Sequence, residues 1–418
     1  MIRRFGVFVL LAMSAVAREE KVSTAEQFHT AAAKAKPGDT IVFKNGGWRD
    51  VKLHFGGTGV TFRAESPGGV TFNVSSELVI DGPRLVVSGF KFESISNLAE
   101  TVTPDQVTVR RVIVFTTNAI GCRLTETAVA NSGTGVTTYV HMRPGSQSNL
   151  VDHCYFSGQQ GIGVTFYVEA HPTIPAFHRV EHNYFGDRKP GQGNGWETMR
   201  IGHSAQQEFL CGTTVASNYF YRCNGELECI SNKSTGNRYL RNTFVETRGQ
   251  LCLRHGNKAL IVGNYFFGGD DPEAQGVRIS GSDHVVVGNY FKDVRDALQV
   301  YNGQVDPELR GYAAVNNTLI ASNAFEHCIN NLILGVGDRG RILTPKKLRI
   351  AHNLVDAAPG SKPMIQQRTP EIDVTYEGNV MFGAELGIAA QPGIEVKEPS
   401  LPKPSPVGRK DVGPPWMN

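Results

Sequence analysis

A short motif of Asn, one variable residue and Phe recurs along the chain and most constrains its fold. Each copy follows a run rich in β-branched residues, such as Leu260-Ile261-Val262 before Asn264. The motif is centred on Asn183, Asn218, Asn242, Asn264, Asn289 and Asn323, with steps of 24, 22 and 25 residues between the second and fifth of these Asn residues. An earlier copy, His153-Cys154-Tyr155-Phe156, has Cys in place of Asn. A longer step fits one coil plus an inserted loop. A strand–turn–strand unit with a period just above 20 predicts a stacked β-coil.

The turns of this repeat indicate which coil it is. A second strand in each unit ends in Gly or Asn, as at Gly202, Asn232, Gly256 and Gly281. Asn and Gly tolerate the left-handed backbone of tight turns, so we expect the motif Asn residues to occupy it. Stacked Asn side chains can also bond one another. A leucine-rich repeat would need a Leu pattern that is missing, and a propeller needs a period near 40. The sequence predicts an all-β, single-domain, right-handed parallel β-helix.

The two ends of the chain differ from the repeat. Residues 1–17 carry two Arg, an apolar stretch and a small-residue cleavage site, so we expect a signal peptide and a secreted or periplasmic protein. Residues 18–391 are the predicted β-helix, capped by an amphipathic N-terminal helix over 24–35 with Ser23 or Thr24 as its N-cap. The Pro-rich residues 392–418 are expected to pack on the helix as a tail.

Composition excludes some partners. The net charge of +3 over 418 residues gives no general affinity for nucleic acid. No stretch is long enough to span a bilayer, so we expect no membrane partner, and we expect a monomer. Seven Cys without a CxxC pair argue against a zinc cage. Cys229 and Cys252 could stack on adjacent coils, and a disulfide between them is left open.

Two carboxylates in one short run suggest a metal site. Glu226 and Glu228 alternate on an expected strand, so their side chains project from the same face. Like charges this close are costly unless a cation joins them. Asn194 lies on what reads as an earlier coil and adds an amide oxygen. Such hard oxygen ligands suit Ca²⁺, although a Glu-x-Glu pair is more often a solvated strand face.

Basic residues follow the carboxylates at the coil period. Arg254 lies 21 residues beyond Lys233, and Arg278 lies 24 beyond Arg254. We therefore expect a ladder of three cations with rungs about 5 Å apart, beside the carboxylates. Separate surface charges are the alternative. A cationic ladder fits a groove for a linear anionic polysaccharide.

This combination suits β-elimination on a uronic acid. A base removes the C5 proton, the bond from C4 to the glycosidic oxygen breaks, and a bound cation neutralises the neighbouring carboxylate. A lysine can act as this base when it is desolvated or crowded by cations. Lys233 is the expected base, and Arg254 is expected beside the leaving oxygen, with His255 able to assist.

The run from Glu226 to Ser234, followed by Asn-x-Phe and by Leu253-Arg254-His255-Gly256, resembles polysaccharide lyase family 6, which includes alginate lyases and chondroitinase B. The likeness covers nearly the whole mature chain. It implies a parallel β-helix, with Ca²⁺ held by Asn194, Glu226 and Glu228, Lys233 as the base and Arg254 as the acid. It also implies that His255 and Arg278 bind the acidic sugar chain. Trp196 departs from the family, which usually has Gly there, so we expect the local loop to differ in shape from that of the family.

These residues are compatible with three functions. The first is a Ca²⁺-assisted lyase that cleaves alginate and leaves 4,5-unsaturated uronate ends. The second is a lyase for dermatan or chondroitin sulfate, which extra basic residues would favour. The third is a non-catalytic polysaccharide-binding β-helix, which predicts that the base or the acid is missing. Lys233 and Arg254 are both present, and this argues against the non-catalytic function.

Overall fold

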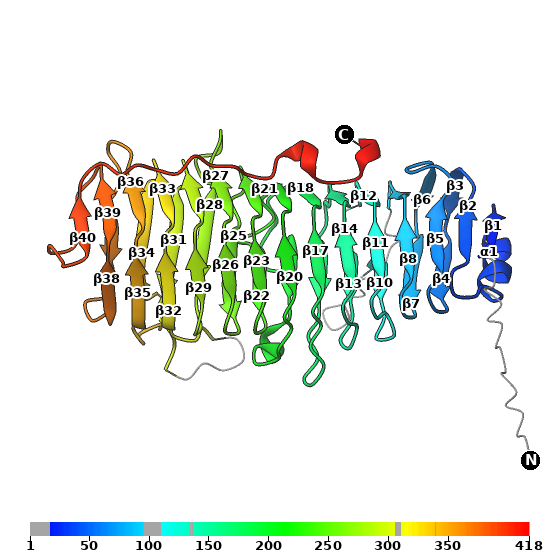
Figure 1. The fold of residues 1–418 in the computed structure, drawn as a ribbon, viewed down its shortest axis with the longest axis horizontal. Helices are drawn as coiled ribbons and strands as arrows, with labels where there is room; N and C mark the ends of the chain where they lie inside the picture. The colour runs from blue at the N-terminus through cyan, green and yellow to red at the C-terminus, as the bar shows by residue number, and fades with distance from the viewer. Residues whose placement is uncertain are drawn as a thin grey trace, which may run out of the picture.

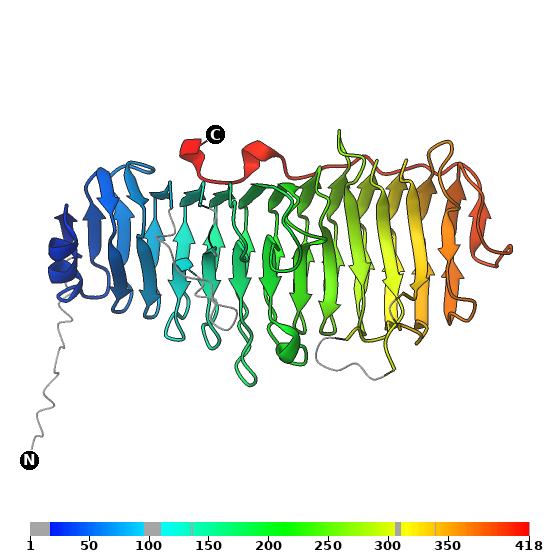
Figure 2. The same ribbon diagram turned by 180° about the vertical axis from the view of Figure 1, so that it is seen from behind.

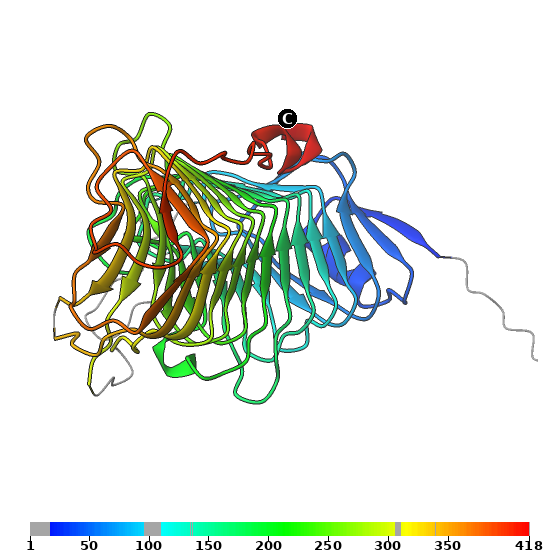
Figure 3. The same cartoon turned by 60° about the vertical axis from the view of Figure 1, so that its left-hand side comes forward.

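Three long parallel sheets, here called sheets A, B and C, wind around one hydrophobic core in an elongated molecule (Figures 1 and 2). The computed structural model describes residues 17–95, 110–133, 135, 137–305, 311–338 and 340–417. Successive coils add one strand to each sheet, and Figure 3 shows the coils stacked along the long axis. The predicted all-β parallel β-helix with an N-terminal capping helix is confirmed.

Hydrogen-bonded neighbours within each sheet come from successive coils. Sheet A consists of β1 (Glu19–Val22), β2 (Thr40–Phe43), β5 (Thr61–Ala64), β8 (Val86–Ser88), β11 (Arg123–Thr125), β14 (Leu150–Asp152), β17 (Arg179–Glu181), β20 (Thr214–Ala216), β23 (Arg238–Leu240), β26 (Leu260–Val262), β29 (Val285–Val287), β32 (Asn316–Ala321), β35 (Lys346–Ala351) and β38 (Val374–Glu377). Sheet B consists of β3 (Gly46–Arg49), β6 (Val70–Asn73), β9 (Phe90–Phe92), β12 (Ala128–Ala130), β15 (Tyr155–Ser157), β18 (Tyr184–Arg188), β21 (Tyr219–Cys223), β24 (Thr243–Val245), β27 (Tyr265–Phe267), β30 (Tyr290–Lys292), β33 (Ala324–Glu326), β36 (Leu354–Asp356), β39 (Asn379–Phe382) and β40 (Ile394–Val396). Sheet C consists of β4 (Lys52–Gly56), β7 (Glu77–Asp81), β10 (Arg110–Phe115), β13 (Thr137–Met142), β16 (Phe166–Val168), β19 (Met199–Ile201), β22 (Glu228–Lys233), β25 (Gln250–His255), β28 (Gln275–Ile279), β31 (Asp296–Tyr301), β34 (Asn330–Val336) and β37 (Ile365–Gln367).

The first coil is covered by helix α1 (Ala25–Ala32). Its N-cap is Thr24, whose side-chain oxygen accepts a hydrogen bond from the backbone N–H of Gln27. Phe28 is fully buried, with its ring 5.4 Å from Phe43 and 5.3 Å from Phe55. The helix ends three residues earlier than the sequence suggested, but it closes the apolar end of the solenoid as expected. None of the helices among the described residues is long and apolar enough to cross a membrane.

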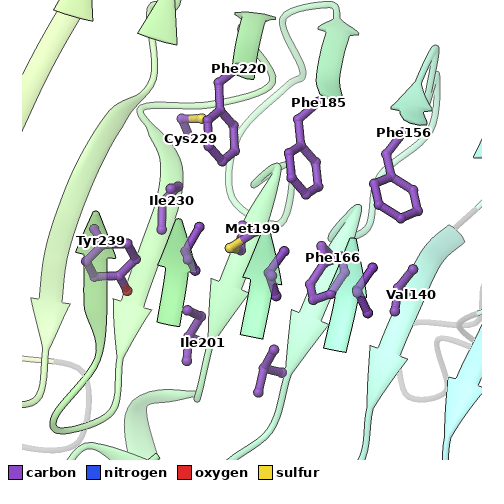
Figure 4. Packing of buried hydrophobic residues seen from close by; sticks show 14 of the residues in the cluster. Val140, Phe156, Phe166, Phe185, Met199, Ile201, Phe220, Cys229, Ile230 and Tyr239 are labelled. Atoms are coloured by element: carbon purple, nitrogen blue, oxygen red, sulfur yellow. The ribbon is translucent and has the colours of Figure 1, made fainter. Parts of the chain in front are cut away.

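The Phe of each motif copy points into the core. Phe156, Phe185 and Phe220 lie in one row across sheet B (Figure 4), and the ring centroids of Phe185 and Phe220 are 4.9 Å apart. The same stacking, with centroids 4.6 to 5.0 Å apart, continues through the later coils along Phe244, Phe266, Phe291 and Phe325. This row buries large apolar rings at the strand spacing, which is the main reason why the coils stack in register.

The Asn of each copy forms a ladder at the corner between sheets A and B. Asn242 donates from Nδ2 to Asn264 Oδ1 at 3.0 Å and to the carbonyl oxygen of Val215 at 2.9 Å. Its own Oδ1 accepts from the next Asn in the other direction, Asn218. The ladder comprises Asn183, Asn218, Asn242, Asn264, Asn289, Asn323, Asn353 and Asn379. The last two were missed because no Phe follows them.

The ladder corrects our expectation about the turn. The left-handed residue is the one before the Asn, for example Ser217 at φ 53° and Arg241 at φ 52°. None of the ladder Asn residues has positive φ. The Asn is therefore selected for its side-chain hydrogen bonds and not for its backbone. At the other corner the expectation holds for Gly202 and Gly256, which both have φ 80°, but it is wrong for Asn232, which lies within β22 and does not have positive φ.

Residues after β40 run back along sheet B, as the red segment of Figure 1 shows. They include two 3-10 helices, η2 (Arg409–Asp411) and η3 (Pro415–Met417); a third, η1 (Ser204–Gln206), follows β19. The Arg409 guanidinium lies 4.4 Å from the ring centroid of Tyr184, and Trp416 Nε1 donates to the carbonyl oxygen of Glu126 at 3.1 Å. Sheet B itself reaches Val396, slightly past the expected boundary. The predicted signal peptide lies almost wholly outside the described residues.

Candidate active site

A cleft of about 690 Å³ opens on the outer side of sheet C. The loops that lead from sheet B to sheet C form one wall, and the loops that leave β31 and β34 for sheet A form the other. It is lined by Pro190, Gly191, Gly193, Asn194, Asn224, Gly225, Glu226, Leu227, Glu228, Arg248, Glu273, Gln275, Arg278, Arg295, Tyr301, Tyr312, Asp338 and Arg341. Four of the seven predicted site residues are among these.

Three carboxylates meet beside this cleft, and two of them, Glu226 and Glu228, line it. One oxygen from each of Glu197, Glu226 and Glu228 lies within 4.8 Å of the other two. Glu228 is the first residue of β22, whereas Glu226 lies in the loop before it. Glu197 comes from the loop before β19, is fully buried, and was missed by the sequence argument. Its position only three residues after Asn194, a predicted ligand, is the signal that could have found it.

Asn194, the third expected metal ligand, lines the same cleft but its side chain is exposed. The loop that carries Asn194 is held by Trp196, the residue that departs from the family. The backbone N–H of Trp196 donates to Glu226 Oε2 at 2.9 Å, and the Arg188 guanidinium lies 5.6 Å from the Trp196 ring centroid. The loop thus orients a predicted ligand through a backbone group, which does not depend on a Gly at 196.

Glu226 is the least compensated of the three acids. Burial raises the pKa of Glu226 to about 7, and the neighbouring Glu197 carboxylate adds to the shift. The hydrogen bond from Trp196 lowers the pKa but does not outweigh the burial. A carboxylate in this state gains from any cation placed beside it.

Glu228 is more fully neutralised by basic residues. Its Oε1 accepts from Arg278 Nη2 at 2.6 Å, and the Ser231 hydroxyl donates to Oε2. Arg254 Nε lies 3.8 Å from the same Oε1. Burial would raise the pKa of Glu228, but the charges of Arg278 and Lys233 outweigh it and lower the pKa. Glu228 is therefore ionised and fixed.

Glu197 joins the carboxylates to the expected base. Arg200 donates to both of its oxygens, at 2.8 and 2.7 Å, which is the bidentate geometry of a strong ion pair. Lys233 Nζ lies 3.7 Å from Glu197 Oε1. The Lys233 side chain is 12% exposed and that of Arg254 is 16% exposed, so both reach solvent from the inner edge of the site.

The expected ladder of cations is wrong in its register. Lys233 pairs across the sheet with His255, because the pairing of β22 with β25 shifts at Asn232 and Lys233. Arg278 pairs with Cys252, two residues before Arg254. The three cations therefore surround Glu197 and Glu228 instead of forming one file. Equal spacing along the sequence could not reveal this bulge.

His255, an expected substrate contact, is 2% exposed and lies outside the cleft lining. Neither ring nitrogen has a hydrogen-bond partner among the described residues. Burial lowers the pKa of His255 to about 3, with Arg254 and Lys233 adding to the shift, so the ring is neutral. It lies behind Arg254, with its centroid 6.5 Å from that of Tyr312.

The seven cysteines of this chain are all buried as free thiols. The pairing of Cys229 with Cys252 that the sequence left open is therefore absent from the structure. Cys252 instead accepts a hydrogen bond at its Sγ from Arg278 Nε at 2.9 Å. This contact orients the arginine that neutralises Glu228.

The cluster of three carboxylates formed by Glu197, Glu226 and Glu228 fits a hard divalent cation. It provides three carboxylates, with the Asn194 amide on the same cleft, and oxygen donors of this kind are the ligands of Ca²⁺. The raised pKa of Glu226 points the same way, since that carboxylate lacks a cationic partner of its own. Glu197 and Glu228 are already paired with arginines, so Glu226 is the residue on which a cation would act most.

Fold and site together define a parallel β-helix protein with a charged cleft across one sheet. The chain belongs to the chondroitinase B family, whose model matches residues 22–407. The matched range includes every predicted site residue and both cleft walls.

Solved structures of related proteins support the same placement. The chain is 28% identical to the family 6 polysaccharide lyase AlyGC, an alginate lyase, with a TM-score of 0.84 over 95% of this chain and 58% of that one. It is 27% identical to a mannuronic acid-specific family 6 lyase from human gut microbiota, with a TM-score of 0.80 over 96% of both chains. It is also 27% identical to the family 6 lyase Pedsa3628 from Pseudopedobacter saltans, with a TM-score of 0.80 over 95% of this chain and 99% of that one. No curated protein matches the chain.

Proposed function

We propose that this protein is a polysaccharide lyase that cleaves alginate by β-elimination. The observation that carries the proposal is the placement of Lys233 and Arg254 on neighbouring strands beside three carboxylates, two of which, Glu226 and Glu228, line a cleft open to solvent. This set provides a base, a group to stabilise the leaving oxygen, and ligands for a cation. The similarity to alginate lyases supports the choice of substrate.

Lys233 is the proposed base. As a free amine, its Nζ accepts the C5 proton of the uronate at the cleavage point, and the C4–C5 double bond forms as the C4–oxygen bond breaks. The neighbouring Glu197 carboxylate, 3.7 Å away, then stabilises the lysine cation that results. Arg200 keeps Glu197 in place through both of its oxygens.

Arg254 is proposed to serve the leaving oxygen. A guanidinium is hard to deprotonate, so it stabilises the developing negative charge by hydrogen bonding while water supplies the proton. Glu226, Glu228 and Glu197, with Asn194, are the residues that would hold Ca²⁺. The chemistry that a bound Ca²⁺ supplies is neutralisation of the substrate carboxylate, which makes the C5 proton more acidic.

Three further arginines that line the cleft are each paired with a carboxylate, and this supports alginate over a sulfated polymer as the substrate. Arg248 is paired with Asp271 at 2.7 Å, Arg295 with Glu273, and Arg341 with Asp338. Each of these cations is already balanced by a carboxylate, which leaves less charge for a sulfate group. A dermatan or chondroitin sulfate lyase is the second candidate, favoured by the name of the matching family.

The test is the ultraviolet absorbance of the conjugated double bond formed at each cut. Purified protein is given polymannuronate, polyguluronate and dermatan sulfate, each with Ca²⁺ or with a chelator. We expect absorbance to rise on an alginate block, to fall with chelator, and to vanish for Lys233→Ala, whose thermal unfolding should match that of the unchanged protein. A signal on dermatan sulfate alone would favour the second candidate. A folded protein that binds polymer without any signal would point to a binding module.

We also propose that the chain is exported. The proposal rests on the charged, apolar and small-residue pattern of residues 1–17. Mass analysis of the protein recovered from the outside of expressing cells would test it. A chain that begins near Arg18 supports export, and an intact Met1 in a cytoplasmic fraction contradicts it.

A further inference from the structure

Tyr312 lies among three arginines at the wall of the cleft opposite Glu226. Arg254 and Arg341 are the nearer two, and the Arg278 guanidinium carbon is 5.9 Å from the ring centroid. The Arg254 guanidinium carbon lies 3.6 Å from the Tyr312 ring centroid, within the range of a strong cation–π contact. The Arg341 guanidinium carbon lies 4.5 Å from the same centroid. Arg254 Nη1 also donates to the carbonyl oxygen of Gly311 at 3.2 Å. Gly311, through its backbone carbonyl, and Tyr312, through its ring, thus both contact Arg254, the proposed partner of the leaving oxygen.

Tyr312 is itself fixed by its surroundings. The Gln304 side-chain oxygen accepts from the Tyr312 backbone N–H at 2.9 Å, and the Gln304 backbone N–H donates to the Tyr312 carbonyl oxygen at 2.9 Å. The Tyr301 ring lies 5.9 Å from the Tyr312 ring at an angle of 19°. A tyrosine held on this many sides can impose an orientation on its neighbour.

We propose that Tyr312 is a positioning residue that aligns the Arg254 guanidinium for catalysis. Arg341 makes a second cation–π contact with the same ring and helps to hold it. The proposal rests on the lyase function inferred above. The contact is made by the face of the aromatic ring, so the ring and not the hydroxyl carries the effect. Gly311 adds a directional hydrogen bond that fixes rotation of the guanidinium plane.

Alignment matters for this step because the leaving oxygen acquires charge only as the C4–oxygen bond breaks. A donor held in place before that moment stabilises the transition state more than it stabilises the bound substrate. Loss of the alignment should therefore lower kcat and change KM little. A small displacement of a catalytic group is enough to cost about 100-fold in rate.

The first test compares Tyr312→Phe with Tyr312→Leu in the full-length protein. We expect Phe to retain kcat within about twofold and Leu to lower kcat by about 10- to 100-fold, with KM changed by less than about threefold. Thermal unfolding shows whether each variant is folded. Tyr221→Leu is the matched control, because it removes an exposed contact with Arg222, 4.9 Å away on sheet B, outside the cleft. That variant should retain the kcat of the unchanged protein.

The second test is a double-mutant cycle with Arg254→Lys, which keeps a cation but not the planar group that stacks on the ring. If Tyr312 acts through Arg254, Tyr312→Leu should lower kcat by less than about threefold in that background. Equal losses in both backgrounds would overturn the proposal, and so would a loss for Tyr312→Phe as large as that for Leu. If the unchanged protein shows no activity on any polymer, it is the lyase function that fails, and the two failures are distinguishable.

Discussion

The Asn ladder and the cluster of three carboxylates are both buried polar networks, yet they differ in how many of their polar groups have a partner. In the ladder, each Asn repeats the bonds of its neighbour, and Asn264 accepts from Asn242 and donates to Asn289 and to Tyr239. In the cleft, Glu228 is neutralised by Arg278 while Glu226 is held by one backbone N–H and has a pKa of about 7. One network is complete by itself, and the other retains capacity for a ligand.

This difference separates stability from function along one solenoid. A network whose donors and acceptors are all used favours a single structure and offers nothing to a substrate. A network with an uncompensated carboxylate costs stability and gains it back when a cation binds. Changes in the ladder should therefore alter unfolding and leave turnover intact, whereas changes in the cleft should alter turnover and respond to ligand.

The largest effect is expected at the buried ion pair of the cleft. Replacing Arg278 with Met leaves Glu228 buried without its closest cation, which should lower the free energy of unfolding by about 3 to 5 kcal/mol. Chemical denaturation measures this loss. Adding Glu228→Gln to the same chain should recover much of it, because the uncompensated charge is removed. A loss below about 1 kcal/mol would show that Glu228 finds another partner.

The ladder should give a slightly smaller loss of a different kind. Asn264→Ala removes four side-chain hydrogen bonds, two accepted from Asn242 and one each donated to Asn289 and Tyr239. Asn289 Oδ1 keeps the backbone N–H of residue 264, so about 3 kcal/mol of stability should be lost, at about 1 kcal/mol for each group left without a partner. Because Asn264 is remote from the cleft, kcat per folded molecule should not change. Asn379→Ala, at the end of the ladder, should cost less. If Asn264→Ala lowers kcat at a temperature where it is fully folded, the separation of the two networks is wrong.

Cation binding should depend on pH through Glu226. Its folded pKa of about 7 exceeds the usual value of 4.5, so the folded protein binds this proton more tightly and loses stability as pH rises between the two values. Ca²⁺ competes with that proton and should raise the unfolding temperature more at about pH 8 than at about pH 5.5. A concentration 100 times the Kd gives about 2.7 kcal/mol. Equal Ca²⁺ shifts at both pH values, or a Glu226→Gln variant that keeps the difference, would contradict this assignment.

The same contrast explains what could be predicted from sequence. The ladder was found because each coil repeats the same residues at nearly the same spacing, as at Asn242 and Asn264. Glu226 and Glu228 were found because they are two residues apart in one run, although only Glu228 lies on the expected strand. Both findings rely on residue types and spacings that can be read along the sequence.

What was missed depends on contacts between segments. Glu197 was passed over because its burial and its contact with Lys233 arise from the loop before β19. Tyr312 is a single aromatic residue in a long loop, and only the fold places it on Arg254. The cation ladder failed for two reasons: a bulge shifts Lys233 onto His255, and Arg278 pairs with Cys252 instead of Arg254. Neither register can be read from the number of residues between the cations.

The smallest effect is expected from the tail, which contacts sheet B and lies outside the cleft. Trp416 donates one hydrogen bond to the Glu126 carbonyl oxygen and is partly buried, so Trp416→Ala should cost about 1 to 2 kcal/mol. Lys403→Ala, an exposed change in the same tail, is the control and should cost nothing measurable. Because the tail lies over sheet B and the cleft lies over sheet C, neither variant should change kcat or the Ca²⁺ shift. A change in either would mean that the two faces are coupled through the coils, which the division into a complete and a ligand-responsive network does not allow.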